Sequence, residues 1–209
     1  MDDLRGRLVE VARRMNGSGI NQGKSGNLSA RCEGGFLITP TGLPYEKLEP
    51  GDLAFMRTDG SHDGPRAPSS EWRFHRDIYV KRGEANAVVH CHSPYATTLA
   101  CLRRAIPAMH YEVAFAGGTD IRCAEYATFG TQALSDNAIA ALEGRRACLL
   151  ANHGTLAFGP TLEAAFALAE KVEALARLYW QALQVGEPIV LDAAEMARVL
   201  ERFKDYGRT

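Results

Sequence analysis

Two histidines, separated by one residue, stand inside an apolar run, Val88-Val89-His90-Cys91-His92. In an extended strand successive side chains point to opposite faces, so His90 and His92 point the same way and Cys91 points the other way. Two neutral imidazoles at this spacing can bind one transition-metal ion. A pair of hydrogen-bonded histidines in a buried strand would give the same pattern, so the spacing alone leaves both interpretations open.

Two further side chains could complete a metal site. The strand-like run 147–151 leads into Asn152-His153-Gly154, which places His153 at a strand end, where it could be a third ligand. Glu71 stands at the start of a predicted helix and shares a face with His75, so its carboxylate can point inward. A carboxylate in a first helical turn also simply compensates the helix dipole, and this alternative stays open. Three histidines and one carboxylate fit a tetrahedral Zn²⁺ site.

Three compact turns could hold an anion, namely Gly26-Asn27, Thr41-Gly42 and Ser69-Ser70. Consecutive exposed N–H groups, with hydroxyl or amide side chains nearby, form a small nest of donors. For the glycine-rich loop before Asn27, a plain flexible connection is the alternative. The Gly23-Lys24-Ser25 segment is not a Walker phosphate loop, because Ser18 stands where that motif needs glycine and a helix precedes the loop.

A metal, a base and an anion pocket together describe one kind of chemistry. If the carboxylate of Glu71 can leave the metal, a coordination position opens and a free base appears beside it. A Lewis acid then polarises a carbonyl while the carboxylate moves the proton of the adjacent carbon. With a phosphate held nearby, this predicts reversible chemistry on a sugar phosphate through an enediolate.

Composition and charge exclude several other functions. The chain has 209 residues, of which 46% are apolar and 23% charged, and a net charge of −1. The balanced charge gives no general attraction for nucleic acid or membrane, so we expect neither as a partner. No apolar run approaches the roughly 20 residues that span a bilayer, and the acidic N-terminus lacks a signal-peptide core, which predicts a cytoplasmic protein.

The five cysteines show no C-x-x-C spacing and are odd in number, so we expect reduced thiols in the core rather than disulfides or a metal site.

Periodicity predicts one α/β domain over residues 1–209. Helices are expected at 2–15, from 68 to about 82, from 93 onward, from about 131 to 143, from 161 to about 185 and from 192 onward. Strands are expected at 28–31, 36–39, 53–56, 88–92 and 147–151. The first three are short and joined by tight turns, which favours antiparallel pairing. Residues 61–68 are expected to form a loop.

At this point a family resemblance is visible in motifs that run through almost the whole chain. They include Ser25-Gly26-Asn27, the runs 39–48 and 68–75, Asn86 to His90, the runs 106–111 and 126–130, His153-Gly154 and Phe203 to Gly207. In these stretches the chain resembles the class II aldolase/adducin family. The resemblance implies a single-domain α/β fold with a central, mostly antiparallel sheet flanked by helices. It also implies a zinc-dependent aldolase that cleaves a ketose 1-phosphate, with L-fuculose 1-phosphate as the expected substrate, to dihydroxyacetone phosphate and an aldehyde.

The resemblance assigns roles residue by residue. Zinc, one ion per chain, would be held by Glu71, His90, His92 and His153, and Glu71 would become the acid/base once substrate displaces it. The phosphate would be held by Gly26, Asn27, Thr41, Gly42, Ser69 and Ser70. Tyr111 and Tyr206 would act near the aldehyde oxygen, reaching across subunits of a homotetramer. Without the resemblance, both tyrosines would be assigned to core or interface packing.

The substrate is the open part of this interpretation. Aldolases or dehydratases that act on 5-methylthioribulose or 5-deoxyribulose 1-phosphate are the alternative, because these relatives share the fold and the metal. Ser93-Pro94-Tyr95-Ala96 after the second histidine is typical of the wider family, which leaves the aldehyde open. Ribulose-phosphate 4-epimerases usually carry aspartate where this chain has Glu71, so the glutamate favours an aldolase. Adducin-type interaction modules lack the full set of metal ligands, so the complete set in this chain argues against such a module. A Schiff-base aldolase is not favoured, since none of the five lysines lies in an apolar strand.

Overall fold

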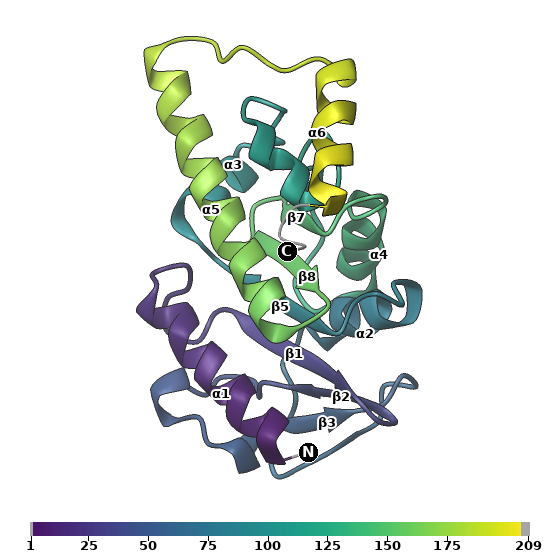
Figure 1. The fold of residues 1–209 in the computed structure, drawn as a ribbon. Helices are drawn as coiled ribbons and strands as arrows, with labels where there is room; N and C mark the ends of the chain where they lie inside the picture. Colours follow the sequence, from purple (N-terminus) through teal and green to yellow (C-terminus); the bar gives the residue numbers. More distant parts are fainter. Residues whose placement is uncertain (1, 206–209) are drawn as a thin grey trace.

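An eight-stranded sheet forms the centre of the protein in the computed structural model, which describes residues 2–205. Its strands lie in the order β4-β3-β2-β1-β5-β8-β7-β6 (Figure 1). Their bounds are β1 Asn27–Cys32, β2 Gly35–Ile38, β3 Ala54–Met56, β4 His62–Asp63, β5 Ala87–Cys91, β6 Cys123–Ala124, β7 Ala147–Leu150 and β8 Gly154–Gly159. Neighbouring strands are antiparallel except β6 and β7. The predicted α/β fold with a mostly antiparallel sheet is confirmed.

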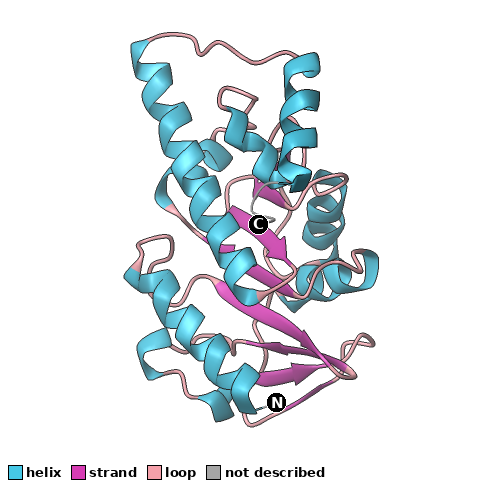
Figure 2. Cartoon of the chain, viewed as in Figure 1, coloured by secondary structure: helices cyan, strands magenta, loops and turns pink. Residues whose placement is uncertain are grey.

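Helices cover both faces of this sheet (Figure 2). They are α1 Asp2–Gly17, α2 Trp72–Lys81, α3 Pro94–Cys101, α4 Gln132–Ala141, α5 Leu162–Val185 and α6 Ala193–Asp205, with 3-10 turns at Tyr45–Lys47, Pro50–Asp52 and Tyr111–Ala116. The larger apolar cluster joins α1, α3 and α5 to one face of the sheet. A second cluster joins α2 and α4 to the other face. The sheet is therefore buried on both sides around β1, β5 and β8.

Strand β5 shows how the alternation of side chains places the histidines. Val89 and Cys91 belong to the apolar cluster under α1 and α5, whereas Val88 belongs to the cluster under α2 and α4. The ring of His90 lies on the α2 side, 5.4 Å from the ring of Phe74. All five residues of β5 are buried. The expectation that Cys91 and His90 face opposite sides is thus confirmed.

Three strands were not predicted from the sequence. The most important is β8, which follows His153 directly, is buried throughout and pairs with both β5 and β7. Its glycine ends and its length hid it between the predicted turn and the predicted helix. The other two, β4 and β6, have two residues each, and β4 lies inside the segment that was expected to be a loop.

The start of α2 also differs from the prediction. The helix was expected to begin at residue 68, but its N-cap position is occupied by Glu71, and no side chain caps the helix there. Instead, the hydroxyl of Ser69 accepts a hydrogen bond from the Glu71 N–H at 3.3 Å. The carboxylate of Glu71 is therefore not used on its own helix, which leaves it available to groups across the sheet.

The cysteines agree only in part with the expectation of reduced thiols in the core. All five cysteines are free, but only Cys91 and Cys148 are buried, while Cys101 is exposed, so the expectation of core thiols is wrong for that residue. Among residues 2–205, no helix combines the length and the apolar character needed to cross a bilayer.

Candidate metal centre and active site

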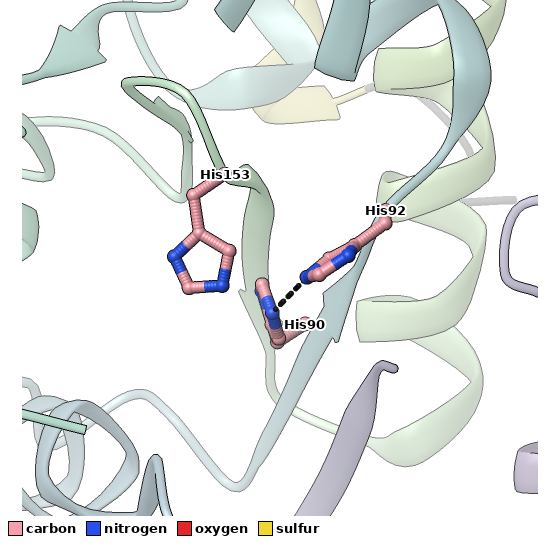
Figure 3. A group of neighbouring side chains, drawn as sticks. All are labelled: His90, His92 and His153. Carbon is pink, nitrogen blue, oxygen red and sulfur yellow. Dashed lines mark hydrogen bonds between the residues drawn. The ribbon is translucent and has the colours of Figure 1, made fainter. Parts of the chain in front are cut away.

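Four side chains from three parts of the chain converge at one end of β5. The Nε2 atoms of His90 and His92 lie 3.1 Å apart, and the ligand nitrogens of His90, His92 and His153 all lie within 4.8 Å of one another (Figure 3). The Glu71 carboxylate completes the group, with Oε2 at 3.2 Å from His90 Nε2 and Oε1 at 3.1 Å from His153 Nε2. The structure thus brings together all four residues that were expected to hold a metal.

The sheet register explains this convergence. His90 is the fourth residue of β5 and lies opposite Asn27 on β1 and Leu156 on β8. His153 precedes β8 directly, and His92 follows β5 directly. Because β8 runs antiparallel to β5, its beginning lies beside the end of β5. The unpredicted strand is therefore the element that positions His153.

Two glycines allow the neighbouring chain segments to approach this end of β5. A Cβ on Gly26 would lie 2.6 Å from the carbonyl oxygen of His90. A Cβ on Gly154 would lie 2.5 Å from the carbonyl oxygen of Cys91 and 2.9 Å from Cδ2 of His92. Real Cβ atoms do not come this close to backbone, so any larger residue at position 154 would push the ligand histidines apart.

The hydrogen bonds of His90 determine which of its nitrogens is free. Its Nδ1 lies 3.0 Å from the carbonyl oxygen of Thr155, which can only accept, so Nδ1 carries the proton and Nε2 presents a lone pair. This lone pair faces the Nε2 of His92 and the carboxylate of Glu71. Such a group of acceptors repels itself unless a cation lies among them. The donor set therefore fits a metal ion.

The distances within the cluster are compatible with a small tetrahedral ion. Bonds of about 2.0–2.2 Å to a tetrahedral zinc ion separate its ligand atoms by roughly 3.3–3.6 Å. The distances around Glu71 and His90, 3.1–3.2 Å, are close to this separation, and the ligand nitrogens of the three histidines spread over at most 4.8 Å.

Electrostatics keep these groups in the states that metal binding needs. Burial, together with the neighbouring His90 and His153, lowers the pKa of His92 to about 4, so its imidazole is neutral at pH 7. Burial of Glu71 opposes ionisation, but without a metal ion, protons on His90 and His153 face the carboxylate, and their attraction outweighs burial and lowers the pKa of this carboxyl. Neutral imidazoles and an ionised carboxylate are the forms that bind metal.

The side chain of Asn27 points into the protein. It is 3% exposed, and its side-chain Nδ2 donates to Glu71 Oε2 at 2.9 Å. Its Oδ1 lies 2.6 Å from Nε2 of His75, a buried residue to which the sequence analysis gave no role. Both polar ends of the side chain are thus used inside the protein. The one signal for His75 in the sequence was its place one helical turn after Glu71.

The three turns that were expected to bind an anion lie side by side. The Ser69 N–H donates to the Thr39 carbonyl at 3.0 Å, and the Leu28 N–H donates to the Thr39 hydroxyl at 3.2 Å, which joins the three segments. Thr41, Gly42 and Ser70 are exposed, whereas Gly26, Asn27 and Ser69 are buried. Of the exposed members, Ser70 lines the same cavity as Glu71.

Two cavities open beside His92. One, of about 360 Å³, is lined by Ser70, Glu71, His153 and the exposed aromatic residues Tyr126 and Phe129. The other, of about 500 Å³, shares Ser25 and His92 with the first and includes Gln22, Thr97 and Leu102. Tyr126 and Phe129 belong to the run 126–130 that carries the family resemblance, but neither was predicted to line the site, because loop residues show no periodicity that separates a pocket wall from surface.

The two predicted tyrosines are not placed in this cavity. Tyr111 is half exposed, stacks on His110 and lies 6.2 Å from the ring of Phe203, and it is not among the described residues that line either cavity. Tyr206 lies outside the described residues. Lys24, in the glycine loop, is exposed to solvent.

Comparison with known proteins gives the family. Residues 6–180 match the model of the class II aldolase and adducin N-terminal domain. The chain belongs to this family. A 5-methylthioribulose-1-phosphate/5-deoxyribulose-1-phosphate aldolase of Rhodospirillum rubrum is 56% identical over 204 residues, which are 98% of this chain and 92% of that protein. An L-fuculose phosphate aldolase of Escherichia coli K12 is 48% identical over 201 residues, which are 96% of this chain and 94% of that protein.

A solved structure supports the same assignment. An L-fuculose 1-phosphate aldolase, 42% identical, covers 98% of this class II aldolase chain and superposes with a TM-score of 0.95, with 97% of its own chain matched. The expected fold class, the expected family and the expectation of an aldehyde-lyase are therefore confirmed.

Proposed function

We propose that this protein is a zinc-dependent aldolase that cleaves a ketose 1-phosphate between C3 and C4, giving dihydroxyacetone phosphate and an aldehyde. The observation that carries the proposal is the convergence of Glu71, His90, His92 and His153 with their acceptor atoms facing one another. One zinc ion per chain would be held by these four residues. When bound, it would supply a Lewis acid that polarises the ketone carbonyl.

Glu71 is the residue that would move the proton. In the cleavage direction, the C3–C4 bond breaks as the hydroxyl at C4 becomes the aldehyde carbonyl and passes its proton through Tyr111 to solvent. The electron pair of the bond stays on the ketone fragment as an enediolate, and the Glu71 carboxylate takes up one proton from solvent. Glu71 then delivers a proton to C3, which completes dihydroxyacetone phosphate. In the reverse direction the same carboxylate removes that proton. The contacts of Glu71 support this role, because its carboxylate lies at the wall of a cavity and is not used by its own helix.

The phosphate would be bound at the junction of the three turns. Exposed Thr41, Gly42 and Ser70 offer hydroxyl and backbone groups to an anion. We propose that Gly26, Asn27 and Ser69 contribute there through their backbone or by holding the exposed groups in place, because their side chains or carbonyls already have partners.

For the substrate, we favour 5-methylthioribulose 1-phosphate and 5-deoxyribulose 1-phosphate, with L-fuculose 1-phosphate as the second candidate. The higher identity to the Rhodospirillum rubrum aldolase supports the first two, and the 0.95 TM-score to a fuculose enzyme supports the third. All three substrates end in a methyl group, and the aromatic wall of Tyr126 and Phe129 beside Glu71 suits such an apolar end.

Tyr111 and Tyr206 belong to this proposal as residues contributed by a neighbouring subunit. Exposure of Tyr111, at 49%, agrees with a residue that reaches outward rather than into its own cavity. We therefore propose a homotetramer with active sites between subunits, working in the cytoplasm on small sugar phosphates.

A panel of phosphorylated ketoses tests the proposal. Zinc-loaded protein is incubated with 5-methylthioribulose, 5-deoxyribulose, L-fuculose and L-rhamnulose 1-phosphates, and with ribulose 5-phosphate, and release of dihydroxyacetone phosphate is followed with a coupled dehydrogenase. We expect the highest kcat/KM with the two pentulose 1-phosphates. A preference for L-fuculose 1-phosphate would change the substrate only. Failure to cleave any ketose 1-phosphate, or epimerisation of the 5-phosphate instead, would overturn the proposed reaction.

A further inference from the structure

A chain of hydrogen bonds runs from the interior of the protein to Glu71. The hydroxyl of Tyr79 lies 2.7 Å from Ser29 Oγ, and Ser29 Oγ lies 2.6 Å from Nδ1 of His75. On the other side of the imidazole ring, Nε2 lies 2.6 Å from Oδ1 of Asn27, whose Nδ2 donates to Glu71 Oε2 at 2.9 Å. Two elements, β1 and α2, thus alternate along one connected path.

Chemistry fixes the direction of every bond in this path. An ionised carboxylate can only accept, so the Asn27 amide must turn its NH₂ toward Glu71 and its carbonyl toward His75. The carbonyl can also only accept, so Nε2 of His75 must carry the proton. Nδ1 is then an acceptor, and the hydroxyl of Ser29 donates to it. Ser29 in turn accepts from Tyr79.

Water cannot substitute for any of these partners. The exposed fractions of His75 and Ser29 are zero, and that of Tyr79 is 4%. Burial lowers the pKa of His75 to about 3, which keeps the ring neutral, with one donor nitrogen and one acceptor nitrogen. A buried, fully connected network holds its members in one arrangement, since any reversal leaves a polar atom unpaired.

We infer that His75 is a positioning residue, which acts through Asn27 to hold the Glu71 carboxylate in the orientation from which it exchanges a proton with substrate. The inference rests on the proposed function of Glu71 as acid/base. Without the Nε2 proton of His75, only the carboxylate itself holds the Asn27 amide, which loses its second anchor and can rotate away from the position that fixes Oε2 of Glu71. Oε1 would keep its place near His153, so metal binding would be less affected than proton exchange.

Two substitutions of His75 distinguish this role from simple packing. The amide nitrogen of glutamine reaches the place of Nε2 and can donate to Asn27, whereas the shorter asparagine reaches only the place of Nδ1. Both remove the ring and both lose volume. We expect His75→Gln to keep the exchange of the C3 proton of dihydroxyacetone phosphate within about fivefold of wild type, and His75→Asn to lower it about 10–100-fold. Zinc content should stay unchanged in both variants.

A matched control comes from α4, the helix that packs against α2. Ser135→Ala removes a buried hydroxyl that donates to Asp77 of α2 at 2.6 Å, with no connection to Glu71. We expect a lower melting temperature for this variant and unchanged proton exchange. Equal exchange rates in His75→Gln and His75→Asn, or exchange that follows melting temperature across all three variants, would overturn the inference.

A measurement on the unaltered, zinc-loaded protein covers the case in which His75→Asn does not fold. Nitrogen NMR of the histidine rings distinguishes the two neutral forms of the ring. We expect His75 to carry its proton on Nε2, and a proton on Nδ1 would overturn the inference. The fate of the proposed function is separate: full exchange activity in Glu71→Gln would remove Glu71 as the base, whereas loss in Glu71→Gln with none in His75→Asn would remove only the role of His75.

Discussion

The metal cluster and the rim around it are built in opposite ways. His90, Glu71 and Asn27 are buried, and each is held by at least one partner from a different element. On the rim, Thr41, Ser70 and Phe129 are exposed and sit on loops. The cluster therefore has one arrangement, set by the sheet, while the rim can vary without disturbing it.

This difference separates the residues that are proposed to carry out the reaction from those that are proposed to recognise the substrate. The groups proposed to hold the metal and move the proton must be placed to within a fraction of an ångström, and they lie on strand ends and a helix start. The groups proposed to contact the phosphate and the aldehyde end lie on loops, where relatives can differ. It explains how relatives named for different ketose 1-phosphates can be similar over nearly the whole chain.

Glu71→Gln is the most severe test of the buried cluster. The change keeps size and neutralises the base, so we expect proton exchange at C3 of dihydroxyacetone phosphate to fall about 10²–10⁴-fold while zinc stays bound to the three histidines. Exchange is measured by deuterium incorporation and zinc by elemental analysis. Asp77→Asn, which neutralises another buried carboxylate of α2, is the control. Undiminished exchange in Glu71→Gln would remove its catalytic role.

Gly154→Ala tests whether the sheet positions the ligands. Its Cβ would meet the Cys91 carbonyl and the ring of His92, so β8 and β5 must separate. We expect zinc affinity to fall about 10–100-fold and the free energy of unfolding to fall by about 1–3 kcal/mol. Competition with a chelator gives the affinity. Gly83→Ala, where a Cβ meets nothing within 4 Å, is the control. Equal affinities in the two variants would contradict the proposed positioning.

Ser70→Ala tests the rim. Loss of one hydroxyl donor to a charged phosphate should raise KM about tenfold and leave kcat and zinc content near those of wild type, because the contact is made equally before and during reaction. Steady-state kinetics with the preferred ketose 1-phosphate measures this. Ser61→Ala, an exposed serine of another loop, should change nothing. A fall in kcat at constant KM would place Ser70 on the reacting side instead.

The burial of His75 predicts that the stability of the protein depends on pH. His75 has its pKa lowered to about 3 by burial, against an ordinary value near 6.5, so the folded state favours the neutral ring. The contribution of the buried neutral ring to the free energy of unfolding is complete above about pH 6.5. It is lost as the pH falls toward 3, at about 1.4 kcal/mol per pH unit. Denaturant unfolding of metal-free protein between pH 6 and 4 should show a steeper loss for wild type than for His75→Gln. Parallel curves would contradict the burial of a neutral His75.

Local patterns were enough to predict much of this site. The alternation around Cys91, the turn that contains His153 and the inward face of Glu71 are all properties of a few neighbouring residues. The contact between Asn27 and His75 joins residues 48 positions apart and depends on how β1 packs against α2, which no local pattern contains. Strand β8 was missed because its six residues begin and end with glycine, which leaves too short a run of strand-forming residues to show a pattern.

The metal content of the purified protein tests the central claim most directly. Elemental analysis of wild type and of His90→Ala, each assayed for aldol cleavage before and after chelation, gives the result. We expect about one zinc ion per chain in wild type, little in the variant, and cleavage that disappears with the metal and returns when zinc is added. A metal-free wild-type protein with full cleavage activity would contradict the account.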